Sequence, residues 1–524
     1  MEDSGAFVDE KERGYGELYR GETCSYWDAV LSGEDEKYEA YTEADLKIKN
    51  FFNNSDDFGK VKKFLEIEGL EPKLKRKLKI LYNLCLEAAG DKALVEEITR
   101  KEGAVKKMFN VFRPSLGGED VSDNDIKKIL SKEKDSGKLK EAWEASKKRG
   151  EICCGPIVEI IKLRNKLAKS LGFENYYLMS LEFQEQNIDE LKKVFDELEE
   201  KTDAPFRKLM GEINDYLSVK HDIDKSELRP WHYEDPYFQE GPSIYDVDLD
   251  SFYGEDILVK ARSYYESLGF DIDDIIKFSD LYERKGKYPH ACCIDMDRKG
   301  DVRTINNLIN NEKWMDTILH ELGHAVYGKN YDEADSFLLR DSPNIYTTEA
   351  IALLFGRKSR NPNFIMSYCG ADVEGVREDI SKMLRVRQIV FCRWCLVMFN
   401  FEQELYRNPD QDLNKLWWDM VKKYQLIDFS RDKPDWASKV HLASCPVYYH
   451  HYMLGELMAS QLHNYIVENY VGDFDSDYSG NKDVSKYLIE KIFKAGNKYT
   501  SSELVERATG EKLTAKYFVV DFCN

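Results

Sequence analysis

The sequence predicts a mainly α-helical protein, and three observations carry this prediction. Apolar residues recur with the spacing of an amphipathic helix along most of the 524 residues. Residues 287–305 have the most strand-like composition of the chain. No Gly/Ser/Pro-rich linker or internal repeat divides the sequence, and 42% hydrophobic and 13% aromatic residues are enough for a sizeable core. We therefore expect one large helical unit with two lobes.

The expected elements follow in chain order. Helices are predicted over residues 38–54, 57–69, 73–89, 92–112 and 187–216. Residues 113–150 are strongly charged and open with Pro114, Gly117 and Gly118, so we expect a solvent loop followed by exposed helices. Proline and aromatic residues are enriched over 228–242, which we interpret as the crossing from an N-terminal lobe, 1–230, to a second lobe, 231–524. The second lobe would contain the strand segment and return to helices beyond Trp314.

Charge and cysteine usage narrow the functional classes. Lys and Arg number 76 and Asp and Glu 97, giving a net charge of −21 without a long basic run, so we expect neither nucleic acid nor an anionic membrane as a partner. The N-terminus lacks a secretion signal, and no run of eighteen apolar residues occurs. Eleven cysteines, an odd count, suit reduced thiols, so the expected location is the cytoplasm. Cys392 and Cys395 are expected to be buried in a helix rather than to bind metal.

The most specific motif is His320-Glu321-Leu322-Gly323-His324. Residues 314–327 contain no proline and have apolar residues at helical spacing, so a helix is expected there. Asn310 or Asn311 could cap its start, and Gly328 could end it. Residues four apart share one helix face, so His320 and His324 can bind one ion while Glu321 lies beside it. This arrangement is typical of a zinc site that activates water; the alternative is a helix with two surface histidines.

A catalytic zinc ion needs a third protein ligand. The downstream candidates are Asp332, Glu333, Asp335, Asp341 and Glu349. Glu349 is favoured because it follows Thr347-Thr348, a possible helix cap, and begins an apolar run in which a carboxylate is costly unless paired or metal-bound. The alternative is that Glu349 only complements a helix dipole. The sequence thus predicts one Zn²⁺ per chain, bound by His320, His324 and Glu349.

These segments resemble the gluzincin peptidases, most closely the angiotensin-converting-enzyme-like dipeptidyl carboxypeptidases and the related thimet and oligoendopeptidase families. The resemblance rests on the His-Glu-x-x-His motif, on residues 337–340 and 347–352, on His290-Ala291 thirty residues upstream, and on Lys439-Val440-His441 with Tyr449 and Tyr452 downstream. It implies a two-lobed helical fold with a deep central channel, zinc on the channel floor and a small edge β-sheet near the zinc. Residues 231–524 would then be the metal-binding catalytic lobe.

The resemblance also implies roles for individual residues. Glu321 would be the general base and Tyr452 the donor to the developing oxyanion, with His441 as a second donor. His290 and Ala291 would bind the substrate backbone as an added strand, and Lys439 with Tyr449 would bind the terminal carboxylate of a peptide. The register is one residue longer than in the converting enzyme, so Tyr448, His450 and His451 remain alternatives for the tyrosine roles. Each could instead belong to an aromatic stripe in the core.

Three positions depart from the converting-enzyme pattern. Tyr233 stands where that family has a glutamine for the substrate carboxylate, and His451 stands where it has an arginine that binds chloride. Leu353 replaces an aspartate that supports a zinc histidine, so another partner must orient that imidazole.

The expected function is hydrolysis of short peptides by a zinc oligopeptidase, most simply a peptidyl-dipeptidase that releases C-terminal dipeptides. Two alternatives remain. One is an endo-acting oligopeptidase of the thimet type, and the other is a peptide-binding metalloprotein without turnover.

Overall fold

The computed structural model describes residues 3–523, which form an almost entirely helical molecule. The first part of the chain contains nine helices. They are α1 (Ser4–Ser32), α2 (Asp35–Phe52), α3 (Ser55–Leu65), α4 (Pro72–Ala88), α5 (Lys92–Val111), α6 (Asp123–Lys132), α7 (Ser136–Ser170), α8 (Tyr176–Phe183) and α9 (Ile188–His221). A two-residue hairpin, β1 (Ser115–Leu116) and β2 (Glu119–Asp120), lies between α5 and α6.

The remainder contains the second hairpin and twelve α-helices. They are α10 (Ile257–Leu268), α11 (Asp273–Phe278), β3 (Cys292–Asp295), β4 (Val302–Ile305), α12 (Glu312–Lys329), α13 (Ile345–Gly356), α14 (Pro362–Phe364), α15 (Arg377–Arg407), α16 (Leu413–Gln425), α17 (His441–Ser444), α18 (His450–Ile466), α19 (Lys482–Leu488), α20 (Ser501–Thr509) and α21 (Lys516–Phe522). The mainly α fold class with a small β-sheet is confirmed.

The five predicted helices of the first part correspond to α2, α3, α4, α5 and α9, with ends that differ by a few residues. Side-chain caps fix several starts: Asp91 accepts the backbone N–H of Leu94 for α5, and Asn187 accepts two N–H groups at the start of α9. The prediction of exposed helices over 113–150 was wrong in part. The helix α7 continues to Ser170, and its apolar stripe, with Leu139 and Trp143 buried, packs in the main core.

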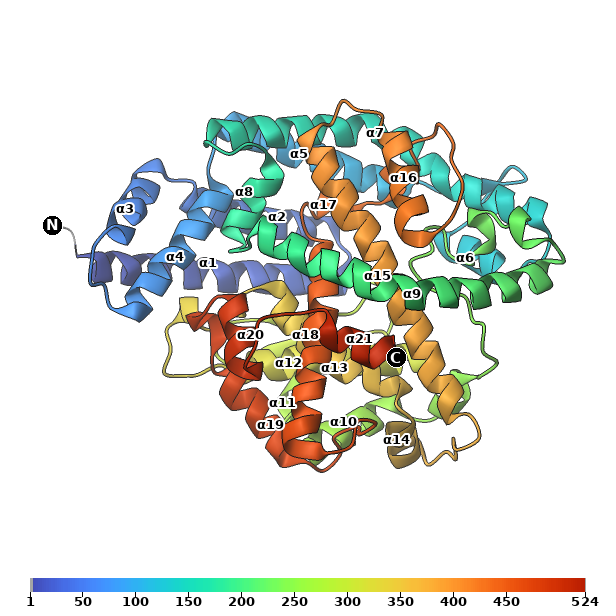
Figure 1. Cartoon of the computed structure of the whole chain (residues 1–524). Helices are drawn as coiled ribbons and strands as arrows, with labels where there is room; N and C mark the ends of the chain where they lie inside the picture. The colour runs from blue at the N-terminus through green and yellow to red at the C-terminus, as the bar shows by residue number, and fades with distance from the viewer. Residues whose placement is uncertain (1–2, 524) are drawn as a thin grey trace.

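Figure 1 shows the helices of the first part above and α10 to α14 below, with the long α15 running between the two regions. Chain order and space do not coincide completely, because α16 and α17 lie in the upper region, where α17 contacts α5 and α7. The division into two lobes at residue 230 remains a proposal. If it holds, α16 and α17 belong in space to the first lobe.

Two further features bear on the sequence analysis. Cys392 and Cys395 are buried in α15 as free thiols, as expected. Within residues 3–523, no helix combines the length and the apolar character needed to span a membrane.

Three helices meet in the lower region: α12 packs on α13, and α13 packs on α18. Glycines permit the close approach. A Cβ atom at Gly323 of α12 would lie 2.8 Å from the Cα atom of Ala352 in α13. A Cβ atom at Gly455 of α18 would lie 3.2 Å from the Cβ atom of Glu349. Because real Cβ atoms do not tolerate 2.8 Å, Gly323 sets the spacing of the first pair.

Candidate metal centre

The two motif histidines and Glu349 converge. The Nε2 atoms of His320 and His324, one turn apart on α12, are 3.2 Å apart. Glu349 on α13 places Oε2 3.6 Å from His320 Nε2 and Oε1 3.9 Å from His324 Nε2. In a tetrahedral site with bonds of about 2.0–2.1 Å, two ligand atoms are separated by roughly 3.3 Å. The three side chains therefore fit one metal ion.

Two local expectations about these helices were wrong. Asn311 caps α12 by accepting the N–H of Trp314, but the helix continues through Gly328 and ends at Lys329. Asn344, rather than Thr347 or Thr348, caps α13, because its side chain accepts the N–H of Tyr346. Glu349 thus lies in the second turn of α13, where a buried carboxylate gains little from the helix dipole, since that effect is confined to the first turn.

Thr348 orients one histidine of the site. Its Oγ1 atom lies 2.8 Å from His324 Nδ1. If Nδ1 carries the proton and donates to Thr348, Nε2 is left free for a metal. Leu353, at the position of the family aspartate, instead lies close to Gly455 of α18. Thr348 was missed as a positioning residue because Thr347-Thr348 also matched a helix cap in the sequence.

Glu321 lies beside the ligand group. The side chain is 6% exposed, and its Oε2 atom has no hydrogen-bond partner. Burial raises the pKa of the Glu321 carboxyl to about 7, against the opposing effect of His320, while the Glu349 charge adds to the increase. Burial likewise raises the pKa of Glu349 and lowers that of His324. An unpartnered buried carboxylate oxygen is costly, and Glu321 lines the same cavity as the three metal-ligand candidates, where a general base would be needed.

A cavity of about 1250 Å³ covers this group. Its wall includes the three metal-ligand candidates, Glu321, Ala291, Tyr452 and Gln239. Ala291 immediately precedes β3, which pairs antiparallel with β4 from Cys292↔Ile305 to Asp295↔Val302. In the described part of the chain, β4 is the only strand that pairs with β3, and Tyr19 of α1 donates to the carbonyl of Asp295 at the end of β3. His290 is exposed, with its ring 5.2 Å from the ring of Tyr288.

The aromatic residues around the start of α18 lie in different surroundings. Tyr452 lines the cavity, and burial followed by the Glu349 charge raises its pKa above the usual range, so its phenol stays protonated. The Tyr448 and Tyr449 rings each lie 5.3 Å from that of Tyr452. His450 Nε2 contacts Gln186 Oε1 at 2.6 Å, and His451 Nδ1 contacts the Tyr448 carbonyl at 3.0 Å. The two histidines thus have partners in the core.

His441 stands next to these tyrosines. Its ring lies 5.1 Å from that of Tyr449 and 6.3 Å from that of Tyr452. Burial lowers the pKa of His441 to about 4, with Lys439 contributing, so the imidazole is neutral near pH 7. A neutral imidazole can still donate a hydrogen bond.

Lys439 contacts Gln239, a residue that the sequence analysis did not single out, as well as the expected Tyr449. Its Nζ donates to Gln239 Oε1 at 2.7 Å, and the rings of Trp394 and Tyr449 surround it. Tyr233 is buried away from Lys439 and donates to Asn214 at 3.0 Å. Gln239, six residues after Tyr233, is the glutamine that lies beside Lys439. No spacing pattern predicts this contact, because the loop that carries Gln239 has no regular structure.

A family model described as angiotensin-converting enzyme, Peptidase M2, matches residues 1–210 and 250–522. This chain belongs to the angiotensin-converting enzyme family of peptidases. Membership confirms the predicted enzyme class, a metallopeptidase, and zinc is the usual cofactor of the family. Residues 211–249, which contain Gln239, fall between the two matched segments.

Individual relatives in the family are distant. Carboxypeptidase 1 of Bacillus subtilis is 25% identical over 285 residues, 49% of this chain and 54% of that enzyme, so the match spans about half of its length. Thermostable carboxypeptidase 1 of Pyrococcus furiosus is 22% identical over 409 residues, 72% of this chain and 75% of the relative. Angiotensin-converting enzyme of Theromyzon tessulatum is 20% identical over 504 residues, 87% of this chain and 80% of the relative.

Proposed function

We propose that this chain is a zinc-dependent oligopeptidase that releases dipeptides from the C-termini of short peptides. One observation carries the proposal: two imidazole nitrogens and a carboxylate lie at tetrahedral separations beside Glu321, on the wall of a large cavity. The names of the three relatives, two carboxypeptidases and a converting enzyme, support action at a peptide C-terminus.

In this proposal His320, His324 and Glu349 would hold one zinc ion, which would act as a Lewis acid and lower the pKa of a bound water. Glu321 accepts the proton of the attacking water and then donates it to the leaving amine. Tyr452 donates a hydrogen bond to the carbonyl oxygen as negative charge develops there, and neutral His441 adds a second donor. The edge of β3 with Ala291 holds the substrate main chain, beside the exposed His290.

The preference for a C-terminal dipeptide rests on the arrangement along α15 and α18. These helices pack antiparallel, because Gln388 contacts Glu456 while Trp394, further along α15, donates to Tyr449 at 2.5 Å. Tyr449, beside Lys439, precedes Tyr452 by three residues, or about 4.5 Å of helix rise. Because the Lys439 ammonium group lies so near Tyr452, the space between them suits a short C-terminal part of the peptide, such as a dipeptide.

Metal binding is tested first and without an activity assay. Purified protein should contain about one zinc per chain, and thermal unfolding should occur at a lower temperature after chelation, because the ion stabilises the folded state in which its ligands meet. His324→Leu should bind substoichiometric zinc. A metal-free purified protein whose melting temperature is insensitive to added zinc would contradict the proposed centre.

Substrate specificity is tested with one N-acetylated pentapeptide carrying either a free or an amidated C-terminus. Release of a dipeptide from the free form, with kcat/KM at least about tenfold higher than for the amide, is expected from one charge-assisted contact. Equal rates would support a thimet-type endo-oligopeptidase instead. Zinc binding and peptide binding without chelator-sensitive hydrolysis would support a peptide-binding metalloprotein.

A further inference from the structure

The two proposed oxyanion donors lie close together in the chain. His441 begins α17, a helix of four residues, and Tyr452 lies in the first turn of α18, which begins at His450. Between these helices, residues 445–449 form neither a helix nor a strand. We refer to residues 441–449 as the donor segment. A single helical turn and a loop are not stable by themselves, so the placement of both donors depends on contacts with other elements.

Arg164 of α7 holds the first half of the donor segment. Its Nη1 group donates to the carbonyl of Leu442 at 3.3 Å, and its Nη2 group donates to the carbonyl of Ala443 at 2.6 Å. A helix cannot provide partners for its own last carbonyls, and in α17 the guanidinium group provides them. Arg164 is 1% exposed, and the carboxylate of Glu102 on α5 balances its charge at 2.6 Å. The helix α17 is therefore attached to two helices of the first part of the chain.

Glu402 of α15 holds the second half of the donor segment. Its Oε1 atom accepts the N–H of Val447 at 2.8 Å, and Gln184 at the end of α8 donates to the carbonyl of the same residue at 3.3 Å. Val447 is fully buried and has a φ of 54°, in the left-handed region that a β-branched residue rarely adopts. Such a conformation persists where surrounding contacts determine it. Side chains from other helices thus hold the turn at Val447.

The turn at Val447 leads directly into the first turn of α18. Tyr452 follows Val447 by five residues in the sequence, and it lines the main cavity. Neither Arg164 nor Glu402 belongs to the described wall of this cavity. Contact with a bound peptide is therefore left to the residues that these two side chains hold in place.

The contact between Glu402 and Val447 does not require a charge. Burial raises the pKa of the Glu402 carboxyl to about 7, although the N–H of Val447 and the charge of Arg164 oppose the increase. A carboxylate and a protonated carboxyl both keep an oxygen that accepts a hydrogen bond. A glutamine side chain of the same size also offers such an oxygen, so it should preserve the contact.

We propose that Arg164 and Glu402 are positioning residues for the two oxyanion donors. Arg164 fixes α17 with His441, and Glu402 fixes the turn that precedes Tyr452. This inference rests on the proposed function and deepens it, because the donor roles are part of that function. Figure 1 shows α7 in the upper region and α18 in the lower region, so the donors depend on helices from both regions.

Two substitutions of Glu402 test its role, with kcat and KM measured for the N-acetylated pentapeptide that has a free C-terminus. Glu402→Leu removes the acceptor for Val447 and should lower kcat by about tenfold or more with KM changed less than about twofold, because a misplaced donor weakens a contact made in the transition state. Glu402→Gln keeps an acceptor and should retain kcat within about twofold of the wild type. A purely structural role would lower the melting temperature without separating kcat from KM in this way.

A double-mutant cycle shows whether Glu402 acts through Tyr452. The Tyr452→Phe enzyme has no hydroxyl left to position, so adding Glu402→Leu should change its kcat by less than about twofold. Losses that multiply would overturn the proposal for Glu402, because independent effects add in free energy. If Glu402→Leu does not fold, the cycle is run in a Val447→Gly background, since glycine adopts a φ of 54° without the steric penalty.

Arg164 is tested in the same way against His441. Arg164→Met should lower kcat by about tenfold in the wild type but by less than about twofold in His441→Phe. Arg393→Met is the matched control, because Arg393 is 2% exposed on α15 and donates to the carbonyl of Glu199 on α9 instead of to the donor segment. The control should lower the melting temperature and leave kcat within about twofold of the wild type. An equal loss of kcat in the control would overturn the assignment of Arg164.

The failure of this inference differs from the failure of the proposed function. If the wild type hydrolyses no peptide, the proposed function has failed. If the wild type hydrolyses the pentapeptide and the folded Glu402→Leu and Arg164→Met enzymes keep the wild-type kcat, the proposed function stands and the positioning roles are wrong.

Discussion

At the residue scale, substitution of Glu321 should affect turnover, whereas substitution of the three proposed ligands should affect zinc binding. Glu321→Gln keeps the size of the side chain and leaves His320, His324 and Glu349 in place, but removes the base. Turnover should fall by roughly 10²–10⁴ or more while the zinc content stays at the wild-type level. Steady-state kinetics and metal analysis on the same preparation measure both, and substantial turnover would show that another group takes the proton.

Tyr452→Phe tests the proposed oxyanion donor, because it removes the hydroxyl and retains the ring packing against Tyr449. A fall of about 10²–10³ in kcat is expected with little change in KM, since the contact strengthens only as charge develops. Tyr448→Phe is the matched control, as its ring lies 5.3 Å from that of Tyr452. A larger loss in the control would move the donor role to Tyr448.

The proposed preference for a free C-terminus should depend on pH through Lys439. Burial lowers the pKa of its ammonium group from 10.5 to about 8, although the Asp235 charge opposes the decrease. Because the charged form is lost as the pH rises through 8, the free-to-amide ratio should decline over pH 7–9 while the peptide carboxylate stays ionised.

Lys439→Met, which has no charge to lose, should give a flat ratio over this range. N-acetylated peptides remove the titration of the substrate amine, and the ratio cancels ionisations common to both peptides. A wild-type ratio that is constant up to pH 9 would contradict the assigned charge state of Lys439.

The proposed metal ligands and base could be predicted from the sequence, because residues close together in the chain determine their positions. His320, Glu321 and His324 are placed by one helix, and Glu349 begins an apolar run in the next helix, so spacing was informative. Gln239 was not predicted, because its position depends on a strained loop and on Gln425 from a distant helix. Asn344 has the capping role that we expected of Thr347-Thr348, because both residue types cap helices and only the backbone decides which one does.

At the element scale, the packing of α12, α13 and α18 determines whether the three ligands meet. Gly323→Ala would place a methyl group 2.8 Å from the Ala352 backbone, so α12 and α13 must separate. A loss of about 1–3 kcal/mol in the free energy of unfolding is expected, together with weaker zinc binding, as Glu349 moves from the histidines. Urea unfolding and chelator competition measure the two effects.

Gly211→Ala in α9 is the matched control. A Cβ atom there meets no other atom within 4 Å, so the substitution should be neutral or stabilise the helix by up to about 1 kcal/mol. Wild-type stability and zinc affinity in Gly323→Ala would show that the helix pair can adjust without moving Glu349.

The elements that sequence patterns missed also have a physical explanation. The helix α1 received no prediction, and its buried residues are few for its length, with Phe7, Val8 and Tyr15 among them. The charged start of α7 was interpreted as exposed, although Leu139, Ala142 and Trp143 form a buried stripe between the charges. In both helices the apolar stripe is narrow and most residues are polar, so the helical pattern is difficult to detect in the sequence.

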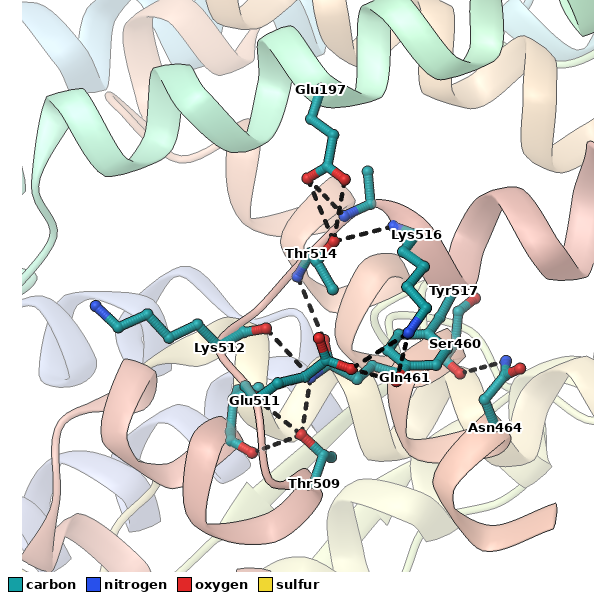
Figure 2. A network of polar contacts seen from close by, with 12 residues as sticks. Glu197, Ser460, Gln461, Asn464, Thr509, Glu511, Lys512, Thr514, Lys516 and Tyr517 are labelled. Carbon is teal, nitrogen blue, oxygen red and sulfur yellow. Dashed lines mark hydrogen bonds and ion pairs between the residues drawn. The ribbon is translucent and has the colours of Figure 1, made fainter. Parts of the chain in front are cut away.

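At the scale of the whole molecule, the loop before α21 contacts α9 in the upper region and α18 in the lower region. Figure 2 shows Gln461 of α18 bonded to the loop that leads into α21, while Glu197 of α9 reaches Thr514 of the same loop. The Gln461 amide donates to Thr509 Oγ1 at 2.8 Å and to two carbonyls, and accepts the Thr514 N–H at 3.3 Å. The Gln461 side chain is 1% exposed, whereas its partners in the loop are only partly buried.

Gln461→Leu should lower the free energy of unfolding by about 1–3 kcal/mol, because it removes these hydrogen bonds and leaves partly buried backbone groups without them. Asn469→Ala, further along the same stretch, changes an exposed side chain and should alter stability by less than about 0.5 kcal/mol. Chemical denaturation of both variants measures the difference. Equal stabilities would mean that the loop finds other hydrogen-bond partners.

The attachment of α21 has a consequence for biosynthesis. Asp521 of that helix lies 3.9 Å from Arg357, which in turn pairs with Glu456 on the cavity wall. His320 and His324 are translated long before α21, and the pair formed by Arg357 and Glu456 on the cavity wall lacks the contact with Asp521 until α21 has left the ribosome. A nascent chain therefore carries the proposed metal ligands before this part of the cavity wall has its last charged partner.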